Sequence, residues 1–299
     1  MPRWFALLLG YRCNNRCLFC GQAEVREADA QPVAEPALRA ALEAARASGS
    51  PGVWLVGGEP TLREDLPQLI GLAREVGFSR VGLQTNGRRL AYGGYRQDLL
   101  AAGLTDLEVS LQGSSADCHD HLTRVPGAFE QTLRGLRGLS GSGLRLGLAT
   151  LLDRSNFRHL GELLRLALRL EAQHLRWSFP QDRGEVRQDP RRVGPRLTLL
   201  APRLRAVADQ LAAAGGGAPR PSLAGVPDCH HPEGFRRGPA DLSEGLRTFG
   251  EACAACPSRE SCPGLAAGYA RHHGTAELTP PATAREILPD DEAPGLYLA

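Results

Sequence analysis

The sequence contains no lysine, so all 35 of its basic residues are arginine. Without a lysine amine the chain cannot form an internal Schiff base, which excludes pyridoxal phosphate chemistry of the usual kind. No apolar run approaches the roughly 18 residues of a membrane span, and FALLLG at 5–10 is too short for the apolar region of a signal peptide. The formal net charge of +2 gives no indication of a nucleic acid or membrane partner.

Eight cysteines are present in the 299 residues. Disulfide frameworks belong mainly to small secreted chains, whereas cysteine clusters in a large chain without a targeting signal more often bind metal. We therefore expect a protein of the reducing cytoplasm whose cysteines are metal ligands.

Short apolar runs alternate with longer segments of helical periodicity through the first 214 residues. This alternation predicts an α/β fold in which a parallel sheet curves into a full or partial barrel, with the active site at the C-terminal edge of the strands. We expect the partial form, a (β/α)6 TIM-like barrel. The expected strands are 4–11, 52–57, 80–85, 106–112, 144–152 and 174–179. The expected helices are 36–48, 63–77, 96–103, 128–140, 156–170 and 195–214.

The pattern changes after residue 214. Residues 215–227 are rich in glycine and proline and predict a linker. Residues 228–275 hold four cysteines and few apolar residues, so we expect a small loop-rich extension held together by metal. The Pro-rich tail at 276–299 either runs over the surface or closes the lower opening of the barrel.

Cys13, Cys17 and Cys20 follow directly on the first expected strand. The spacing C-x3-C-x2-C lets one loop wrap a compact cluster, and three thiolates on a 4Fe–4S cluster leave one iron without a protein ligand. An open metal position is typical of a catalytic site. The alternative is a structural zinc site, but zinc would need a nearby fourth Cys or His, and none occurs between residues 21 and 117.

Together, CNNRCLFC at 13–20 and GGEP at 57–60 resemble the radical S-adenosylmethionine (radical SAM) superfamily, over roughly residues 5–180. The resemblance implies that the open iron binds the amino and carboxylate groups of S-adenosylmethionine. It also implies that one electron from the cluster releases a 5′-deoxyadenosyl radical, which abstracts hydrogen from a substrate.

Further residues fit contacts to S-adenosylmethionine. By resemblance, Phe19 packs against the adenine, the GGEP segment pairs with the methionine amino group, and HDHLTR at 119–124 is similar to an HD-x-x-R arrangement with one extra residue. Polar side chains at strand ends could bind ribose or carboxylate, although Thr, Asn and Ser there are also common turn formers. The candidate set is Phe19, Gly57, Gly58, Glu59, Pro60, Thr85, Asn86, Ser110, Gln112 and Arg124.

Cys118 lies in the loop expected after the fourth strand. A thiol at that edge could donate a hydrogen atom to a product radical, as radical epimerases do. The alternative is a small buried apolar side chain.

Cys229, Cys253, Cys256 and Cys262 form a second cluster. Four thiolates can ligate a 4Fe–4S cluster completely, and the segment resembles the SPASM and twitch extensions that hold auxiliary clusters. The shorter twitch form fits four cysteines better, and such a cluster would carry electrons. The alternative is a structural zinc site, with these cysteines or with His230 or His231 among the ligands.

Auxiliary clusters accompany many radical enzymes that modify peptides, so the resemblance favours a peptide or protein substrate and implies a reductant such as flavodoxin or ferredoxin. Only 12 residues precede Cys13, so a peptide would dock on the barrel or arrive with a separate recognition protein. One alternative is a small metabolite or cofactor precursor as substrate. Another alternative, from a different class, is a non-catalytic iron–sulfur protein that carries electrons, or a binding module that zinc holds together.

Overall fold

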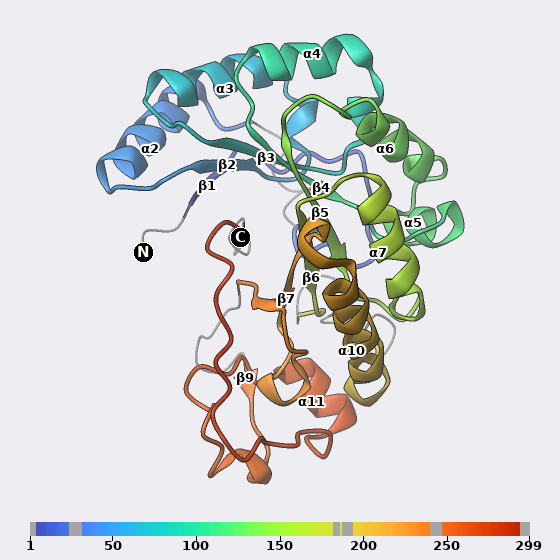
Figure 1. The fold of residues 1–299 in the computed structure, drawn as a ribbon. Coiled ribbons are helices and arrows are strands. Elements are labelled where there is room, and N and C mark those ends of the chain that lie inside the picture. Colours follow the sequence, from blue (N-terminus) through green and yellow to red (C-terminus); the bar gives the residue numbers. More distant parts are fainter. Residues whose placement is uncertain (1–3, 24–31, 182–185, 187–193, 240–246, 294–299) are drawn as a thin grey trace.

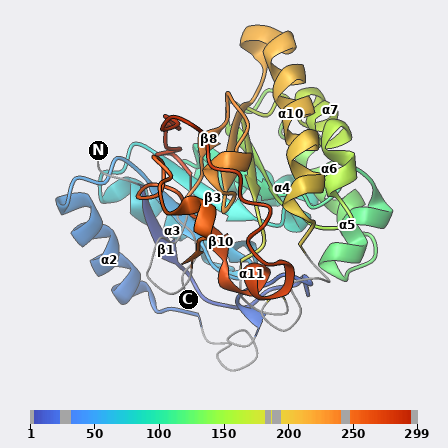
Figure 2. The same ribbon diagram turned by 90° about the horizontal axis from the view of Figure 1, so that it is seen from below.

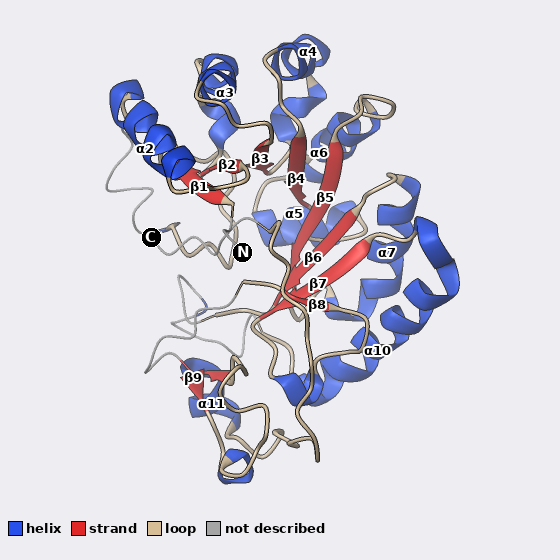
Figure 3. Cartoon of the chain, turned by 60° about the vertical axis from the view of Figure 1, so that its left-hand side comes forward, coloured by secondary structure: helices blue, strands red, loops and turns tan. Residues whose placement is uncertain are grey.

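The computed structural model describes residues 4–23, 32–181, 186, 194–239 and 247–293. Eight parallel strands form one sheet in chain order, and the sheet curls into a partial barrel (Figure 1). The helices follow the outside of the curve (Figure 3). The expected α/β partial barrel is therefore confirmed.

The first six strands correspond to the six that the sequence predicts, and two more extend the sheet. The strands are β1 (Phe5–Leu8), β2 (Val53–Val56), β3 (Val81–Thr85), β4 (Asp106–Ser110), β5 (Arg145–Leu151), β6 (His174–Ser178), β7 (Arg220–Ala224) and β8 (Arg236–Arg237), with β9 (Arg247–Thr248) and β10 (Leu265–Ala266) forming a separate antiparallel pair. The α-helices are α2 (Glu35–Ala47), α3 (Leu66–Glu75), α4 (Gly93–Ala101), α5 (Ala116–Thr123), α6 (Ala128–Arg137), α7 (Leu160–Arg169), α10 (Leu197–Ala214) and α11 (Ala267–His273). Short 3-10 turns are η1 (Pro60–Leu62), η2 (Arg88–Ala91), η3 (Phe157–His159), η4 (Gly215–Gly217), η5 (Asp228–His230) and η6 (Glu251–Cys253).

The core lies between the sheet and the outer helices. All four residues of β2 are buried, as expected for a parallel strand that is covered on both faces. On α7, Leu160, Leu163, Leu164 and Ala167 are buried, which is the three-to-four residue period of a helix that packs one face on a sheet. Burial of each such leucine contributes about 1.5–3 kcal/mol relative to exposure.

The predicted linker is wrong in part, because residues 220–224 form β7 inside the main sheet. Pro221 is compatible with this strand. Pairing of β7 with β8 begins only at Ser222, so no β8 residue stands opposite Pro221 to require its missing N–H. The sheet therefore continues beyond residue 214 to the start of the C-terminal cysteine segment. The elements of that segment, β9 and α11 among them, lie at the bottom of Figure 1 and therefore face the viewer in Figure 2, which is seen from below.

The C-terminal tail is hydrogen-bonded to residues near the N-terminal ends of the strands. The indole of Trp54, on β2, donates a hydrogen bond to the carbonyl of Glu292 at 3.0 Å. The Glu292 carboxylate accepts one from Arg145, the first residue of β5, at 2.7 Å. The tail thus lies across the N-terminal ends of the strands. Within the described residues, no helix has the length and apolar character needed to span a bilayer.

Candidate active site

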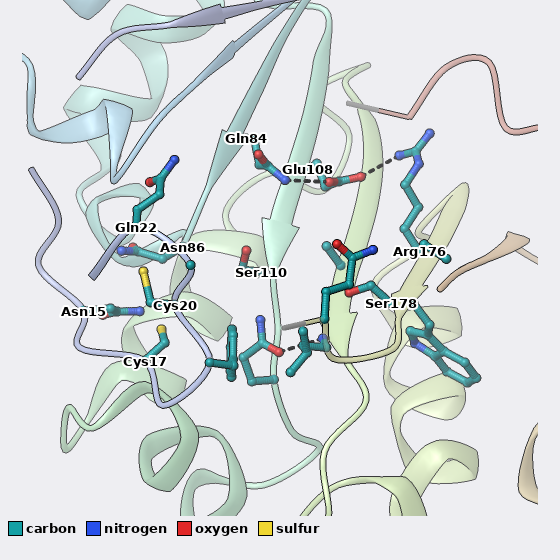
Figure 4. A pocket seen from close by; sticks show the side chains of 18 of the residues that line it. Asn15, Cys17, Cys20, Gln22, Gln84, Asn86, Glu108, Ser110, Arg176 and Ser178 are labelled. Carbon is teal, nitrogen blue, oxygen red and sulfur yellow. Dashed lines mark hydrogen bonds and ion pairs between the residues drawn. The ribbon is translucent and has the colours of Figure 1, made fainter. Parts of the chain in front are cut away.

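A cavity of about 370 Å³ opens at the C-terminal edge of the strands and continues into the concave side of the sheet. Figure 4 shows that Cys17 and Cys20 lie at one end and that Glu108 and Arg176 lie further along the sheet. Most of the residues predicted from the sequence line this one cavity. They are Cys13, Cys17, Phe19, Cys20, Gly57, Gly58, Thr85, Asn86, Ser110 and Gln112.

The two glycines of the GGEP segment let the backbone of the cysteine loop pass closely. A Cβ on Gly58 would lie 2.3 Å from the carbonyl oxygen of Tyr11 and 2.4 Å from that of Arg12. The amide of Gly58 donates to the carbonyl of Gly10 at 2.9 Å, and that of Glu59 donates to Arg12 at 2.7 Å. Glycine is required here because any side chain would push the cysteine loop away.

The opposite side of the cysteine loop is held by α5 and by the turn after β3. The amides of Arg16 and Leu18 donate to the carbonyls of Thr123 and Leu122, each at 3.0 Å. Arg88 donates from Nη1 to the carbonyl of Asn14 at 2.6 Å and to the side chain of Asn15 at 3.0 Å. The loop that carries the three cysteines is therefore fixed from both sides.

Glu59 of the GGEP segment is buried, and its carboxylate accepts several hydrogen bonds. Its carboxylate accepts hydrogen bonds from the amide and hydroxyl of Thr61, the hydroxyl of Thr85 at 2.6 Å and the amide of Asn86 at 2.6 Å. Burial raises the pKa of Glu59, although each of these donors lowers it. Glu59 and Pro60 do not line the cavity beside the cysteines but a neighbouring one, so they join β2 to β3 rather than face that cavity.

Ser110 and Gln112 extend from the end of β4 along the cavity wall. The side-chain oxygen of Gln112 accepts a hydrogen bond from the amide of Leu151 at 2.9 Å, which ties the ends of β4 and β5 together. The side-chain amide nitrogen of Gln112 has no hydrogen-bond partner among the described residues. It is therefore available to a bound molecule.

Besides Glu59 and Pro60, two more residues predicted for this site, Arg124 and Cys118, do not line the cavity. Arg124 is an exposed C-cap residue of α5 with a left-handed φ of 55°. Cys118 lies in the first turn of α5, where the sequence predicted a loop, because the side chain of Ser115 caps this helix by accepting from the Cys118 amide. Its thiol is 3.9 Å from the carbonyl of Gln112, and burial, together with Asp153, raises its pKa to about 11.

Sequence reasoning missed the deeper part of the cavity. Glu108 and Arg176, from the middle of β4 and β6, are its only charged lining residues within the described part of the chain. Glu108 accepts hydrogen bonds from Arg176 at 2.8 Å and from Gln84 at 3.1 Å (Figure 4). The available signal was a charged residue in the middle of each apolar strand, in DLEVS and HLRWS.

The four C-terminal cysteines line one small cavity of their own. The amides of Asp228 and Gly264 each point at the Cys262 sulfur at 3.4 Å, as backbone groups do around ligating thiolates. Burial raises the pKa of Cys262 to about 11, so the free thiol keeps its proton. No three Cys, His, Asp or Glu side chains of the described chain converge closely enough to hold a single metal ion. Four thiols around one cavity are a ligand set that suits a 4Fe–4S cluster or a structural zinc ion.

A model of the Radical SAM superfamily matches residues 7–167, which is more than half of the chain. Among curated relatives, the AdoMet-dependent heme synthase of Methanosarcina barkeri (strain Fusaro / DSM 804) is 31% identical over 186 residues, 62% of this chain and 53% of that protein. The Fe-coproporphyrin III synthase of the same organism is 34% identical over 154 residues, 50% of this chain and 37% of that protein. The chain thus aligns with about half or less of the length of these relatives.

Solved structures share the fold at low sequence identity. SuiB of Streptococcus suis, bound to its precursor peptide SuiA, has a TM-score of 0.60 and 18% identity, covering 72% of this chain and 47% of that one. The anSMEcpe structure with AdoMet and the Kp18Cys peptide has a TM-score of 0.59 and 14% identity, covering 72% of this chain and 62% of that one.

Proposed function

Because the chain belongs to the radical SAM superfamily, we propose that Cys13, Cys17 and Cys20 hold a 4Fe–4S cluster whose open iron binds S-adenosylmethionine in the adjoining cavity. When bound, these groups supply a 5′-deoxyadenosyl radical that abstracts hydrogen from a substrate. The observation that carries the proposal is that three thiols and the polar strand ends line one cavity.

The chain's own residues have separable roles in this site. Gly57 and Gly58 form the wall nearest the cysteine loop, while Phe19 offers an apolar surface for the adenine. Ser110, Asn86 and the unpartnered amide of Gln112 supply hydrogen bonds for ribose or carboxylate.

We further propose that the substrate is a small molecule, with iron porphyrins as the class to test first. The peptide substrate favoured by the sequence is less well supported, because the curated relatives named above are a heme synthase and an Fe-coproporphyrin III synthase. SuiB and anSMEcpe have bound peptides, but identities of 18% and 14% support only the fold. A low-potential donor such as flavodoxin or ferredoxin would supply the electron.

For the second cysteine site we propose an auxiliary 4Fe–4S cluster held by Cys229, Cys253, Cys256 and Cys262. The support is that all four thiols line one cavity and that two amides point at Cys262. Cluster ligation by four thiolates leaves no open iron, so its role would be electron transfer. A zinc site remains the competing assignment.

Metal analysis tests both sites. Anaerobically reconstituted protein should contain about eight irons and eight sulfides per chain, and either Cys13/Cys17/Cys20→Ala or Cys253/Cys256→Ala should lower this to about four. About four irons and one zinc would instead make the C-terminal site structural.

For the substrate, iron coproporphyrin III and a short peptide should be incubated separately with the reduced enzyme. A mass change confined to the peptide would contradict the small-molecule proposal.

A further inference from the structure

The deep end of the cavity is built from residues at matching positions of neighbouring strands. Gln84 is paired with Glu108 in the register of β3 and β4, and Arg176 is paired with Ser222 in that of β6 and β7. On β5, Gly147 is paired with Glu108 and lies two positions before Ala149, the register partner of Arg176. A Cβ on Gly147 would lie 2.9 Å from Nη1 of Arg176 and 3.6 Å from Oε2 of Glu108, so glycine leaves room for the ion pair across β5.

The C-terminal tail completes this arrangement. Asp290 Oδ2 accepts a hydrogen bond from Nε of Arg176 at 2.9 Å, and the Ser222 hydroxyl bonds to the same carboxylate. The tail is held in place because its Asp290 amide donates to the carbonyl of Arg237 at 2.8 Å. Arg237 in turn donates to both carboxylate oxygens of Asp228, at 2.6 and 2.9 Å. Arg176 is thus clamped between β4 and the tail.

One side of the Arg176 guanidinium is left for a ligand. Arg176 is 8% exposed and lines the cavity, with Nε and Nη1 engaged by Asp290 and Glu108. No described residue accepts a hydrogen bond from Nη2 of Arg176. This nitrogen is also not one of the buried side-chain atoms that lack a hydrogen-bond partner in the described chain, so it is not shut off from solvent. Its N–H groups therefore face the cavity, where an acceptor oxygen could take them.

Arg176 is the only positively charged residue that lines the cavity within the described part of the chain. Burial alone would raise the pKa of Asp290, but Arg176 and Ser222 hold it below its usual value, so Asp290 stays ionised and balances Arg176. Burial raises the pKa of Glu108, although Arg176 and Gln84 lower it. Guanidinium groups recognise carboxylates well because their planar N–H donors match the two carboxylate oxygens.

We propose that Arg176, positioned by Asp290 of the C-terminal tail and by Glu108, is the substrate anchor of the cavity and binds a carboxylate of the substrate. This inference rests on the proposed small-molecule function. It makes the tail part of the active site, since the tail sets the orientation of the residue that receives the substrate.

The test uses optical titration of the reconstituted enzyme, with S-adenosylmethionine present, by iron coproporphyrin III and by its iron tetramethyl ester. Wild-type protein should bind the free acid at least about 10-fold more tightly than the ester, because only the acid offers carboxylates to the anchor. Arg176→Lys keeps the charge but loses the planar fork and should weaken binding of the acid about 10-fold. Its binding of the ester should be unchanged, a selectivity that a general structural defect would not produce.

Two tail variants separate positioning from folding. Asp290→Asn should weaken binding of the acid about fivefold, because it loosens the clamp on Arg176. Glu292→Gln, two residues further along the same tail and bonded to Arg145, should bind both probes as the wild type does. Wild-type enzyme that binds acid and ester equally, or Arg176→Lys that binds the acid as tightly as wild type, would overturn the anchor and leave the proposed function standing. Failure of wild-type enzyme to bind the acid at all would overturn both.

Discussion

Nδ2 of Asn86 donates a hydrogen bond to Oδ1 of Asn14 at 2.7 Å, so the turn after β3 is joined to the loop that carries the first three cysteines. The same turn places Arg88 against the carbonyl of Asn14 and the side chain of Asn15. The position of the proposed cluster therefore depends on residues about 70 positions later in the chain, as the separations of 72 to 74 residues show.

Arg88→Met should make the N-terminal cluster easier to lose. The change removes hydrogen bonds from a charged donor to the loop, each contributing about 1.5–3 kcal/mol. The rate at which a chelator removes iron should rise in this variant. Arg134→Met, which removes an exposed arginine of α6, is the matched control and should leave the rate unchanged. Equal rates in Arg88→Met and wild type would show that the hydrogen bonds do not hold the loop.

Gly58→Ala should abolish S-adenosylmethionine cleavage. Its Cβ would meet two backbone carbonyl oxygens that have no means of rotating away, so the cysteine loop must shift. Displacement of reacting groups by about 1 Å can reduce a rate about 100-fold. The control is Gly71→Ala in α3, where no atom lies within 4 Å of the new Cβ and where alanine should stabilise the helix by about 0.5–1 kcal/mol. Normal cleavage by Gly58→Ala would contradict this account of the GGEP glycines.

Cys118→Ser should cleave S-adenosylmethionine and form product within about twofold of wild type, because the thiol packs against Gln112 and does not line the cavity. The measurement is the ratio of product to 5′-deoxyadenosine under multiple turnovers. If cleavage persists but product is lost, the thiol is a hydrogen donor after all.

Protein stability should fall as the pH drops below about 6.5, in part through His174. Burial, followed by the Arg176 charge, lowers the pKa of His174 to about 4 in the folded protein. Between about pH 6.5 and 4 the unfolded chain therefore binds a proton at His174 that the folded chain does not bind. This lowers the free energy of unfolding by up to about 1.4 kcal/mol per pH unit. His174→Gln should lose less stability than wild type between about pH 7.5 and 5.5 in calorimetry. Exposed His272→Gln should behave like wild type, and an unchanged slope in His174→Gln would refute the assignment.

The sequence predicts those parts of the molecule that depend on neighbouring residues. The alternation of apolar runs and helical periods predicts β1–β6 and most of the outer helices, because burial on the sheet imposes those periods locally. The spacing of Cys13, Cys17 and Cys20 likewise predicts a metal-binding loop from residues that are close together in the chain. The last two strands of the sheet were missed because β7 contains a proline and β8 has only two residues.

The parts that the sequence does not predict depend on partners far apart in the chain. Arg176 and Asp290 are separated by 114 residues, and no local pattern indicates that the tail reaches β6. Glu59 belongs to a motif that the sequence does reveal, yet its four hydrogen bonds show that its carboxylate joins two strand ends rather than facing the cavity. A motif thus locates a site, while the orientation of each side chain follows from packing.

The most direct test of the central claim is production of 5′-deoxyadenosine by the reduced, reconstituted protein supplied with S-adenosylmethionine. We predict that the wild type forms it and that Cys13/Cys17/Cys20→Ala does not, while Cys253/Cys256→Ala, with the N-terminal loop intact, still does. A wild-type protein that retains its iron and sulfide but releases no 5′-deoxyadenosine above the level of the triple variant would contradict the assignment of a radical SAM active site to this cavity.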